Sequence, residues 1–414
     1  MNPSDVCGEK IRIMTVIGQY YPYLGGAENV ARHIVEQTNG DGFCNHVLTE
    51  SSEAVQKLSK HRLTFQEKNG NHWIYRFSRF HLRGKEKNGP FFKYYTFAKY
   101  LLHLVRRRRQ YDVIHAHTYY WPAFASVLAG KWLRKPVIVT GHNQIKRLVA
   151  ESAAGKYPTR LVKALTSTTR YVAISTEIKQ EASALLGIAP QKVSLIPNGI
   201  DTKRFRPANA DERLQIRRRL GIHPDEFVVI YHGRLEQHKH PEKLVELVAR
   251  LTKAGIRCRG LLVGTGSMQQ QLAATLAGEQ WIPATLLKFQ ANIEEYLRVC
   301  DAYYLPSEME GFSLALLEAM ASGLPCMAND IPGNRDLIVH GVNGFLLANS
   351  QVSEAMSVIQ MIRAGQGMEE LRRNARKSVV EQYSIANMVD TYKTLYRDVL
   401  KRPLLANPKV STQS

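Results

Sequence analysis

Short apolar runs alternate with longer amphipathic segments along this chain of 414 residues, and the alternation limits what it can fold into. Two series of apolar runs are expected to form strands. The first covers residues 11–17, 112–115, 137–140, 171–174 and 193–196, and the second covers 228–231, 260–263, 286–289, 302–305 and 325–328. Helical spacing occupies segments between them, such as 28–37, 241–252, 268–277 and 314–321. Because apolar strands that alternate with helices form parallel sheets covered on both faces, the sequence predicts an α/β protein with two doubly wound domains.

The length of the chain also suits two domains, each large enough for its own core. A stretch rich in turn-forming residues, 196–207, separates the two series. We therefore predict an N-terminal domain over residues 1–200 and a second domain over 201–383. A helix is expected over 384–402, because Met388, Tyr392, Leu395, Tyr396 and Val399 fall on one side of it. Residues 403–414 are expected to form a disordered tail.

The composition is that of an ordinary globular protein, with 44% hydrophobic and 22% charged residues. The sequence shows neither an apolar run long enough to span a bilayer nor an N-terminal signal core, so a cytoplasmic protein is expected. The five cysteines, Cys7, Cys44, Cys258, Cys300 and Cys326, are scattered, and no pair has the spacing of metal ligands. We interpret them as reduced and mostly structural.

The net charge of +20 is unevenly distributed. Residues 1–200 hold 29 Lys and Arg against 13 Asp and Glu, a balance of +16, whereas residues 201–414 hold 27 against 23, a balance of +4. Such a basic half favours an anionic partner: nucleic acid, an anionic membrane or an acidic substrate. The densest patch, four arginines at 106–109, follows an aromatic segment with Tyr94, Tyr95, Phe97 and Tyr100. It can lie on a membrane surface, or its arginines can cap a helix end, and the sequence supports both equally.

Two carboxylates, Glu310 and Glu318, stand eight positions apart around the start of the predicted helix at 314–321. Glu310 falls in the preceding loop, and Glu318 falls inside the helix. The free N–H groups of a first helical turn suit an anion such as a sugar-nucleotide diphosphate. This segment can therefore hold a phosphorylated ligand at two points. The alternative is an ordinary amphipathic helix with a carboxylate near its positive end.

Two cations, Arg234 and Lys239, follow the predicted strand at 228–231. The position is the carboxyl edge of a parallel sheet, where such folds bind ligands, and both side chains suit phosphate oxygens. A pair of ordinary surface cations is the alternative. Gly264 and Gly266 end the next strand, either to keep side chains away from a nucleotide or as a plain turn.

Gly25 and Gly26 follow the first strand, where glycines let the backbone approach a phosphate, although a tight turn explains them equally well. The pattern is not that of a dinucleotide-binding or nucleotide-triphosphate loop. His142 follows the strand at 137–140, and His115 and His117 end the strand before it. No carboxylate or cysteine has metal-ligand spacing relative to these histidines. His115 and His117 are therefore interpreted as structural, and His142 as a functional candidate.

Taken together, these motifs resemble glycosyltransferase family 4, the large retaining family with the GT-B fold. The resemblance covers nearly the whole chain and rests on Gly25-Gly26-Ala27-Glu28, Ile196-Pro197-Asn198-Gly199-Ile200-Asp201, Gly233-Arg234 with Lys239, Pro306-Ser307, and Glu310 with Glu318. It implies two Rossmann-like domains that face each other across a cleft, with the sugar nucleotide held mainly by the second. It also implies that the helix at 384–402 crosses back to the N-terminal, acceptor-side domain.

The resemblance implies a role for each matching position. It makes Glu310, beside the donor sugar, and His142, near the reacting carbon, the catalytic residues. The implied donor-binding residues are Gly26, Arg234, Lys239, Phe312, Ser313, Leu314 and Glu318. Two positions depart from the family pattern: His240 stands where glycine is usual, and Asp336 stands where glutamate is usual. No metal site or cofactor is expected apart from the nucleotide-diphosphate sugar as co-substrate, because cations and helix dipoles would take the place of a metal.

The implied activity is retaining, metal-independent transfer of a sugar to an acceptor in cell-surface glycan, exopolysaccharide or glycolipid synthesis. The expected partners are the nucleotide sugar, a glycan or lipid-linked acceptor, and an anionic membrane surface for the N-terminal domain of a peripheral protein. One alternative is a sugar-nucleotide epimerase of the same fold, which the carboxylate spacing disfavours. Another is a basic nucleic-acid-binding protein, although the sequence shows no recognition element, and no nucleic-acid partner is expected.

Overall fold

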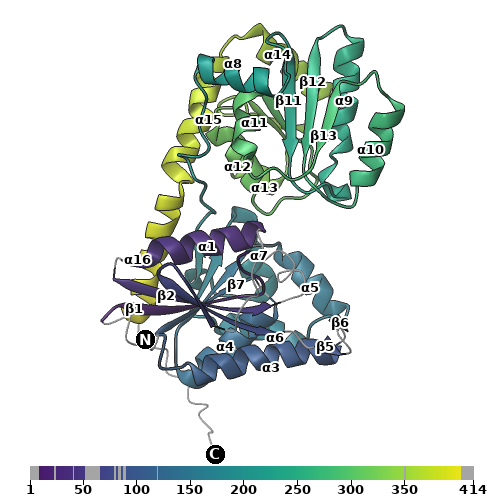
Figure 1. Cartoon of the computed structure of the whole chain (residues 1–414). Coiled ribbons are helices and arrows are strands. Elements are labelled where there is room, and N and C mark those ends of the chain that lie inside the picture. Colours follow the sequence, from purple (N-terminus) through teal and green to yellow (C-terminus); the bar gives the residue numbers. More distant parts are fainter. Residues whose placement is uncertain are drawn as a thin grey trace, which may run out of the picture. The chain divides into compact units, whose positions relative to one another are not determined.

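The computed structural model describes residues 9–22, 25–40, 42–51, 66–78, 81–82, 85–86, 90–118, 120–348 and 351–401. The chain divides into two compact units (Figure 1). The first unit consists of Met1–Pro197 with Met388–Ser414, and the second is Asn198–Asn387. Each unit contains a largely parallel sheet with helices on its faces, which confirms the predicted α/β architecture. The tail predicted at 403–414 lies outside the described residues.

The first unit has one large sheet with the strand order β10-β9-β8-β7-β1-β2-β4-β3. Its pairs are parallel except for β3, which runs antiparallel to β4 at the edge. The strands of this unit are β1 (Ile11–Ile17), β2 (Phe43–Ser51), β3 (Gln66–Asn69), β4 (His72–Ser78), β5 (His81–Leu82), β6 (Lys85–Glu86), β7 (Val113–His117), β8 (Val137–Gly141), β9 (Arg170–Ala173) and β10 (Val193–Leu195). β5 and β6 form a separate antiparallel pair.

Helices cover both faces of this sheet, with α1 on one face and α3 and α4 on the opposite one (Figure 1). The helices are α1 (Gly26–Thr38), α3 (Pro90–Arg106), α4 (Trp121–Leu133), α5 (Ile145–Ala153), α6 (Thr159–Ala164), α7 (Thr176–Leu186) and most of α16 (Ile385–Lys401), with the short η2 (Leu165–Ser167) and η3 (Pro190–Lys192). The boundaries of α7 follow from its sequence. The Ser175 side chain accepts a hydrogen bond from the N–H of Ile178, and Gly187 ends the helix in the left-handed region.

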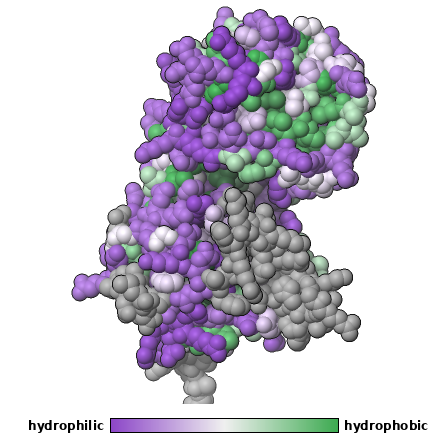
Figure 2. Space-filling view, in the orientation of Figure 1, coloured by the Kyte–Doolittle hydropathy of each residue, from purple (hydrophilic) through white to green (hydrophobic). Residues whose placement is uncertain are grey.

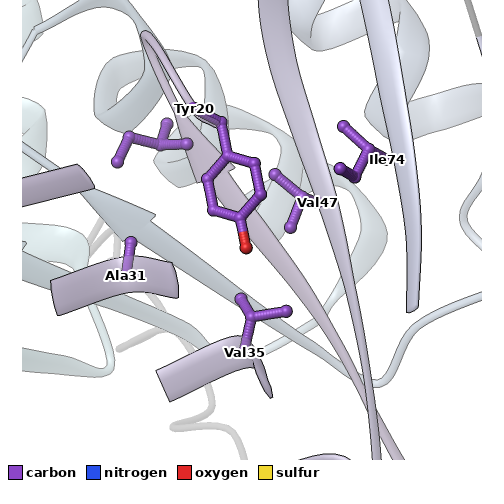
Figure 3. Close-up of a cluster of buried hydrophobic side chains, with 6 residues drawn as sticks. Tyr20, Ala31, Val35, Val47 and Ile74 are labelled. Atoms are coloured by element: carbon purple, nitrogen blue, oxygen red, sulfur yellow. The ribbon is translucent and has the colours of Figure 1, made fainter. Parts of the chain in front are cut away.

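The core between α1 and the sheet is built around the ring of Tyr20 (Figure 3). Ala31 and Val35, one helical turn apart on α1, face this ring from one side, and Val47 on β2 lies on the other. All four side chains are fully buried. The apolar spacing along α1 thus fixes which face of the helix packs on the sheet.

β2 was not predicted, because its sequence FCNHVLTES carries several polar residues. All nine of its residues are nevertheless buried. The polar groups of Asn45 find hydrogen-bond partners within the unit. Its side-chain oxygen accepts a 2.8 Å hydrogen bond from the hydroxyl of Thr15, and its backbone N–H donates to the side-chain oxygen of Asn39 at 2.8 Å. Partners supplied by β1 and by the end of α1 therefore make a central position possible for a strand whose composition does not suggest one.

The final helix, α16, begins in the second unit, and from Met388 onward it belongs to the first. Two buried tyrosines join it to the first sheet. Tyr396 hydrogen-bonds to Nδ1 of His115 at 2.7 Å, and Tyr392 hydrogen-bonds to Thr140 at 3.1 Å. The apolar side expected for this helix is the side that is buried.

The second unit has a parallel sheet with the order β13-β12-β11-β14-β15-β16. Its elements are α8 (Ala210–Arg219), β11 (Phe227–His232), η4 (Gln237–Lys239), α9 (Glu242–Lys253), β12 (Cys258–Val263), α10 (Gln269–Gly278), β13 (Ala284–Leu287), α11 (Ile293–Val299), β14 (Ala302–Leu305), α12 (Leu314–Ala321), β15 (Cys326–Asn329), α13 (Pro332–Arg335), β16 (Phe345–Leu347), α14 (Val352–Ala364) and α15 (Met368–Gln382). β13 begins two residues before the predicted strand at 286–289, and Phe289, expected inside that strand, is 66% exposed.

Most of the surface that is coloured by hydropathy is hydrophilic, and the second unit shows an apolar area on the side where α9 and α10 lie (Figure 2). Within the described part of the chain, no helix combines the length and apolar character needed to cross a bilayer. Cys258, Cys300 and Cys326 are free and buried. Cys44 is disulfide-bonded, so the interpretation of all five cysteines as reduced is wrong for this residue.

Candidate functional site

The sheet of the second unit brings its predicted site residues together at one edge. β11 and β14 are neighbours and parallel, so the loops that follow them leave the sheet side by side. Arg234 and Lys239 lie in the loop after β11, and Glu310 lies in the loop after β14. Residues more than seventy positions apart in the sequence are thus placed where doubly wound sheets bind ligands.

Lys239 and Glu310 form the closest pair in this group. Nζ of Lys239 lies 2.6 Å from Oε2 of Glu310, and the two side chains are only 13% and 10% exposed. The ammonium also donates to the carbonyl oxygen of Met309 at 3.3 Å. Since a lysine has three N–H donors, two of them account for these contacts and one remains for an anion.

Two backbone features hold this loop pair in place. A Cβ at Gly333 would lie 2.3 Å from the carbonyl oxygen of Glu310, so only glycine allows the turn at the start of α13 to pack there. His240 adopts a left-handed backbone with φ of 50°, a conformation that glycine, the residue implied there by the family resemblance, adopts without strain. Its ring lies 2.7 Å from Glu242 and 2.8 Å from Glu308.

Arg234 differs from Lys239 in having no internal partner. It is exposed, and it makes no ion pair with any residue in the described ranges. Its backbone is fixed, because the hydroxyl of Tyr231 donates a 2.7 Å hydrogen bond to its carbonyl oxygen. A guanidinium on a fixed backbone beside Gly233 is well suited to bind an anion bidentately.

Gly264 and Gly266 support the same loop from the neighbouring strand, β12. A Cβ at Gly264 would lie 1.8 Å from the carbonyl oxygen of Gly233, and one at Gly266 would lie 2.3 Å from that of Leu235. Both contacts are far shorter than any Cβ tolerates. These glycines therefore let two loop backbones approach each other, a packing reason that the sequence did not reveal.

Helix α12 places the second carboxylate. Ser313 caps the helix, since its hydroxyl accepts a 3.2 Å hydrogen bond from the N–H of Leu316. Leu314 is the first helical residue, and Phe312 before the cap is 8% exposed, with its ring 5.8 Å from that of Tyr383. Because the hydroxyl of Ser313 caps the helix, the backbone of residues 312–314 is the part of this segment that can contact a ligand.

Glu318 has a partner that sequence reasoning missed. Nε2 of His232, the last residue of β11, lies 2.7 Å from Oε2 of Glu318. The histidine is 7% exposed, and its Nδ1 is buried without a hydrogen-bond partner among the described residues. The sequence does carry one signal for this role: His232 is a polar residue at the end of an apolar strand, directly before Gly233 and Arg234. The histidine fixes the carboxylate orientation.

We expect His232 to act on donor binding through Glu318. His232→Ala should raise the donor KM about tenfold, because a hydrogen bond to a charged group contributes about 1.5–3 kcal/mol. Glu318→Ala should raise it at least as much, with kcat changed less. The donor KM of the double variant should be little higher than that of Glu318→Ala alone, since both substitutions remove the same hydrogen-bonded pair.

Steady-state kinetics of the two single variants and the double variant check this. Fully additive effects on KM would show that His232 acts independently of Glu318. His232→Phe keeps an aromatic ring but cannot form the hydrogen bond, so it separates the loss of this bond from the loss of packing.

The first unit holds the two other predicted residues. Gly26 is exposed and begins α1, with Gly25 as its N-cap. His142 follows β8, and its Nε2 lies 3.0 Å from Nδ1 of His117. Burial lowers the pKa of His142 to about 4, so its imidazole is neutral at pH 7. A neutral histidine can position a sugar hydroxyl as a hydrogen-bond donor or acceptor.

His115 and His117 lie deeper than His142. His115 bonds through Nδ1 to Tyr396 and through Nε2 to Thr140 at 2.8 Å, and burial lowers its pKa to about 3. Burial also holds the pKa of His117 well below its usual value. Within the described ranges, no group of three or more His, Cys, Asp or Glu side chains could hold a metal ion. The hydrogen bonds of His115 join the sheet to α16, which is a structural contribution.

Two family models match this chain. The model described as Glycosyltransferase Family 4 matches residues 24–204, and the one described as Glycosyl transferases group 1 matches residues 212–378. These ranges do not overlap, and between them they include every predicted site residue, the whole second sheet and all strands of the first sheet except β1. The chain is therefore a glycosyltransferase, as its sequence motifs predicted. It belongs to glycosyltransferase family 4.

Curated relatives agree with this assignment. The chain is 26% identical over 306 residues to the UDP-Gal:alpha-D-GlcNAc-diphosphoundecaprenol alpha-1,3-galactosyltransferase of Escherichia coli, covering 72% of this chain and 78% of that protein. It is 26% identical to the putative glycosyltransferase EpsD of Bacillus subtilis, covering 70% and 78%. It is 29% identical to the D-inositol 3-phosphate glycosyltransferase of Geodermatophilus obscurus, covering 61% of this chain and 60% of that protein.

Solved structures confirm the GT-B fold. Anabaena HepE in complex with UDP matches with a TM-score of 0.73 at 19% identity, covering 94% of this chain and all of that chain. Sucrose-phosphate synthase from Thermosynechococcus elongatus matches with a TM-score of 0.73 at 18% identity, covering 94% and 99%. These relatives and structures give no support to the epimerase or nucleic-acid-binding alternatives.

Proposed function

We propose that this protein is a retaining, metal-independent glycosyltransferase that moves a sugar from a nucleotide-diphosphate donor to a glycan or lipid-linked acceptor. The observation that carries the proposal is the grouping of Arg234, Lys239 and Glu310 at one sheet edge, with Lys239 and Glu310 2.6 Å apart. The same unit presents Glu318, oriented by His232. Cations for a diphosphate and carboxylates for sugar hydroxyls are the groups that a nucleotide sugar requires.

The charges that develop during transfer suit these residues. As the bond between the anomeric carbon and the diphosphate oxygen breaks, positive charge grows on the sugar ring and negative charge on the leaving diphosphate. Arg234 and the remaining donor of Lys239 stabilise the diphosphate, and Glu310 stabilises the ring. Glu318 holds the ribose. Retention follows if the acceptor attacks on the face that the diphosphate leaves, with the departing phosphate taking the acceptor proton.

Relatives narrow the choice of substrates to test. HepE has been solved with UDP and with UDP-glucose, and the E. coli relative is named for a UDP-galactose donor and a diphosphoundecaprenol-linked acceptor. We propose a UDP-sugar as the donor and a lipid-linked glycan as the acceptor. For Gly26 and His142, the roles in donor contact and near the reacting carbon remain predictions.

The test is a donor screen with the purified full-length protein. UDP-, GDP- and ADP-sugars are incubated with and without EDTA, and slow donor hydrolysis is followed by NMR of the anomeric proton. We expect hydrolysis of one class, undiminished by EDTA, because side-chain cations face the diphosphate. The sugar should first be released with the anomeric configuration of the donor. Complete loss of activity in EDTA, restored by Mg²⁺ or Mn²⁺, would contradict the metal-free mechanism.

We also propose that the first unit binds an anionic membrane surface through the arginines at 106–109. Arg106, Arg108 and Arg109 are exposed, whereas Arg107 is half-buried over the ring of Tyr75 at 4.2 Å. The sequence also suggests that the aromatic residues Tyr94, Tyr95, Phe97 and Tyr100 add membrane contacts beside these arginines, and for Tyr100 this expectation is wrong. Its side chain is fully buried, and its hydroxyl donates to the carbonyl oxygen of Ile17 at 3.0 Å.

Vesicle flotation tests this surface. Changing Arg106, Arg108 and Arg109 to Gln should release the protein from anionic vesicles at low salt, since each such charge contributes about 1 kcal/mol. Raising the salt should release the wild type as well. The control changes three exposed cations of the second unit, Lys203, Arg218 and Arg257, to Gln. Equal release of both triple variants, or no binding by the wild type, would exclude this surface.

A further inference from the structure

The first unit contains a pocket that is separate from every residue discussed above as catalytic or donor-binding. Its volume is about 530 Å³, and its walls come from the first turn of α3, the start of α4 and the loop between α5 and α6. The residues that define its chemistry are Lys93, Tyr94, Trp121, Lys156, Tyr157 and Thr159. We call it the aromatic–lysine pocket.

The topology places this pocket at the carboxyl edge of the first sheet. Trp121 begins α4 a few residues after β7 ends, and α3, which leads back to the start of β7, begins at the same edge. The loop after α5 returns to this edge, because the ring of Tyr157 lies 5.5 Å from that of Tyr120. His142 follows β8, the neighbour of β7, at the same edge. Ligands of doubly wound folds bind there.

Aromatic rings make one wall of the pocket rigid. The ring of Trp121 lies 5.4 Å from that of Tyr94 and 5.7 Å from that of Tyr157. Behind it, Phe97 and Phe124 pack at 6.1 and 6.0 Å. Trp121 and Tyr157 are buried, whereas Tyr94 is 50% exposed. A braced aromatic wall with one open ring is a surface for an apolar chain, at little cost in side-chain entropy.

The pocket also carries positive charge beside this apolar wall. Lys93 is half-buried and makes no ion pair with any residue in the described ranges. Lys156 lies 2.7 Å from Glu151, and Arg147 lies 3.3 Å from the same carboxylate. Among the described residues, the two pocket lysines and the neighbouring Arg147 thus stand against one carboxylate, Glu151, which leaves a balance of two positive charges. Because an apolar wall and a surplus of ammonium groups meet here, the complementary ligand is apolar at one end and anionic at the other.

We propose that the aromatic–lysine pocket binds a phosphorylated amphiphile, that is, a phosphate or diphosphate ester of an apolar chain. Lys93 and Lys156 hold the phosphate, and Tyr94 and Trp121 contact the first carbons of the chain. This inference rests on the proposed function, since it makes the pocket an anchoring site for a lipid-linked acceptor. A neutral glycan would use the rings but not the lysines, and a free phosphate would use the lysines but not the rings.

Calorimetric titration of the full-length protein with farnesyl diphosphate below its micellar concentration tests the pocket. We expect farnesyl diphosphate to bind at least tenfold more tightly than either farnesol or inorganic pyrophosphate. Lys93→Gln and Tyr94→Ala should each weaken binding at least fivefold. In a parallel fluorescence titration, farnesyl diphosphate should change the tryptophan emission of the wild type, and Trp121→Phe should abolish that change. Arg234→Ala, which weakens the diphosphate site of the second unit, should leave this binding unchanged.

Matched controls lie at the other end of α4, about 15 Å along the helix from Trp121. Lys131→Gln removes an exposed charge, and Trp132→Ala removes a ring that is 61% exposed, so neither should change the affinity. Equal binding of pyrophosphate or of farnesol would overturn the amphiphile assignment. Unchanged affinity in both Lys93→Gln and Tyr94→Ala would place the ligand elsewhere.

The donor reaction separates this proposal from the proposed function. Lys93→Gln and Tyr94→Ala should hydrolyse the nucleotide sugar at the wild-type rate, because neither residue is placed in donor binding. If they do so while farnesyl diphosphate fails to bind the wild type, the pocket proposal fails and the transferase stands. If no nucleotide sugar is hydrolysed by any form, the proposed function fails whatever the pocket binds.

Discussion

Glu310→Gln is expected to lower kcat by a factor on the order of 10²–10³, with a much smaller change in donor KM. The carboxylate is 10% exposed and paired with Lys239, so its charge acts in a poorly solvated place. Glutamine keeps the shape and removes the charge that stabilises the sugar ring as the donor bond breaks. The loss should therefore appear in the chemical step.

Single-turnover and steady-state kinetics with the donor found in the screen measure this effect. Glu308→Gln is the matched control, because Glu308 lies in the same loop with a 62% exposed side chain and faces His240. It should retain nearly all activity. A Glu310→Gln enzyme with normal kcat and a raised KM would mean that Glu310 only binds the donor, and that the roles given to Glu310 and Glu318 are exchanged.

Arg234→Ala and Lys239→Ala should each weaken nucleotide-sugar affinity by a factor of about 10–100, because each removes a charge-assisted bond worth about 1.5–3 kcal/mol. The two variants should differ in stability. Arg234 is exposed and unpaired within the described ranges, so its loss leaves the fold unchanged. Loss of Lys239 leaves the largely buried Glu310 without its cation and should lower Tm.

Calorimetry with UDP and thermal unfolding together check this pair. Arg218→Ala, which removes an exposed arginine on α8, serves as the control for general loss of positive charge. Wild-type affinity in both variants would remove the diphosphate assignment. A raised Tm in Lys239→Ala would show that the ion pair with Glu310 costs more to bury than it contributes.

Both central sheets could be predicted in outline, because apolar runs that strands bury on both faces are visible in one dimension. β1 and β14 occupy the expected residues, and α12 begins and ends where its spacing predicted. Edge strands and strands that carry polar residues could not be predicted from apolar runs. β2 can bury Asn45 because Thr15 on β1 and Asn39 at the end of α1, neither of which belongs to β2, complete its hydrogen bonds.

Much of the candidate site was visible in the sequence as well. Arg234, Lys239, Glu310 and Glu318 were found because motif spacing and strand ends place them at one edge of a parallel sheet. Their partners were not. Neither the 2.6 Å pair of Lys239 with Glu310 nor the 2.7 Å contact of His232 with Glu318 could be predicted, because each joins elements separated by more than seventy residues.

The sequence by itself determined the α/β class, the glycosyltransferase family and the residue types available at the donor edge, since these depend on local periodicity and on spacing within short segments. Only the tertiary structure decided which of these residues touch. It set the charge partner of Lys239, the orientation of Glu318 and the aromatic wall around Trp121. Each of these depends on strand order and loop packing, and the free energy that fixes them comes from contacts between segments distant in the chain.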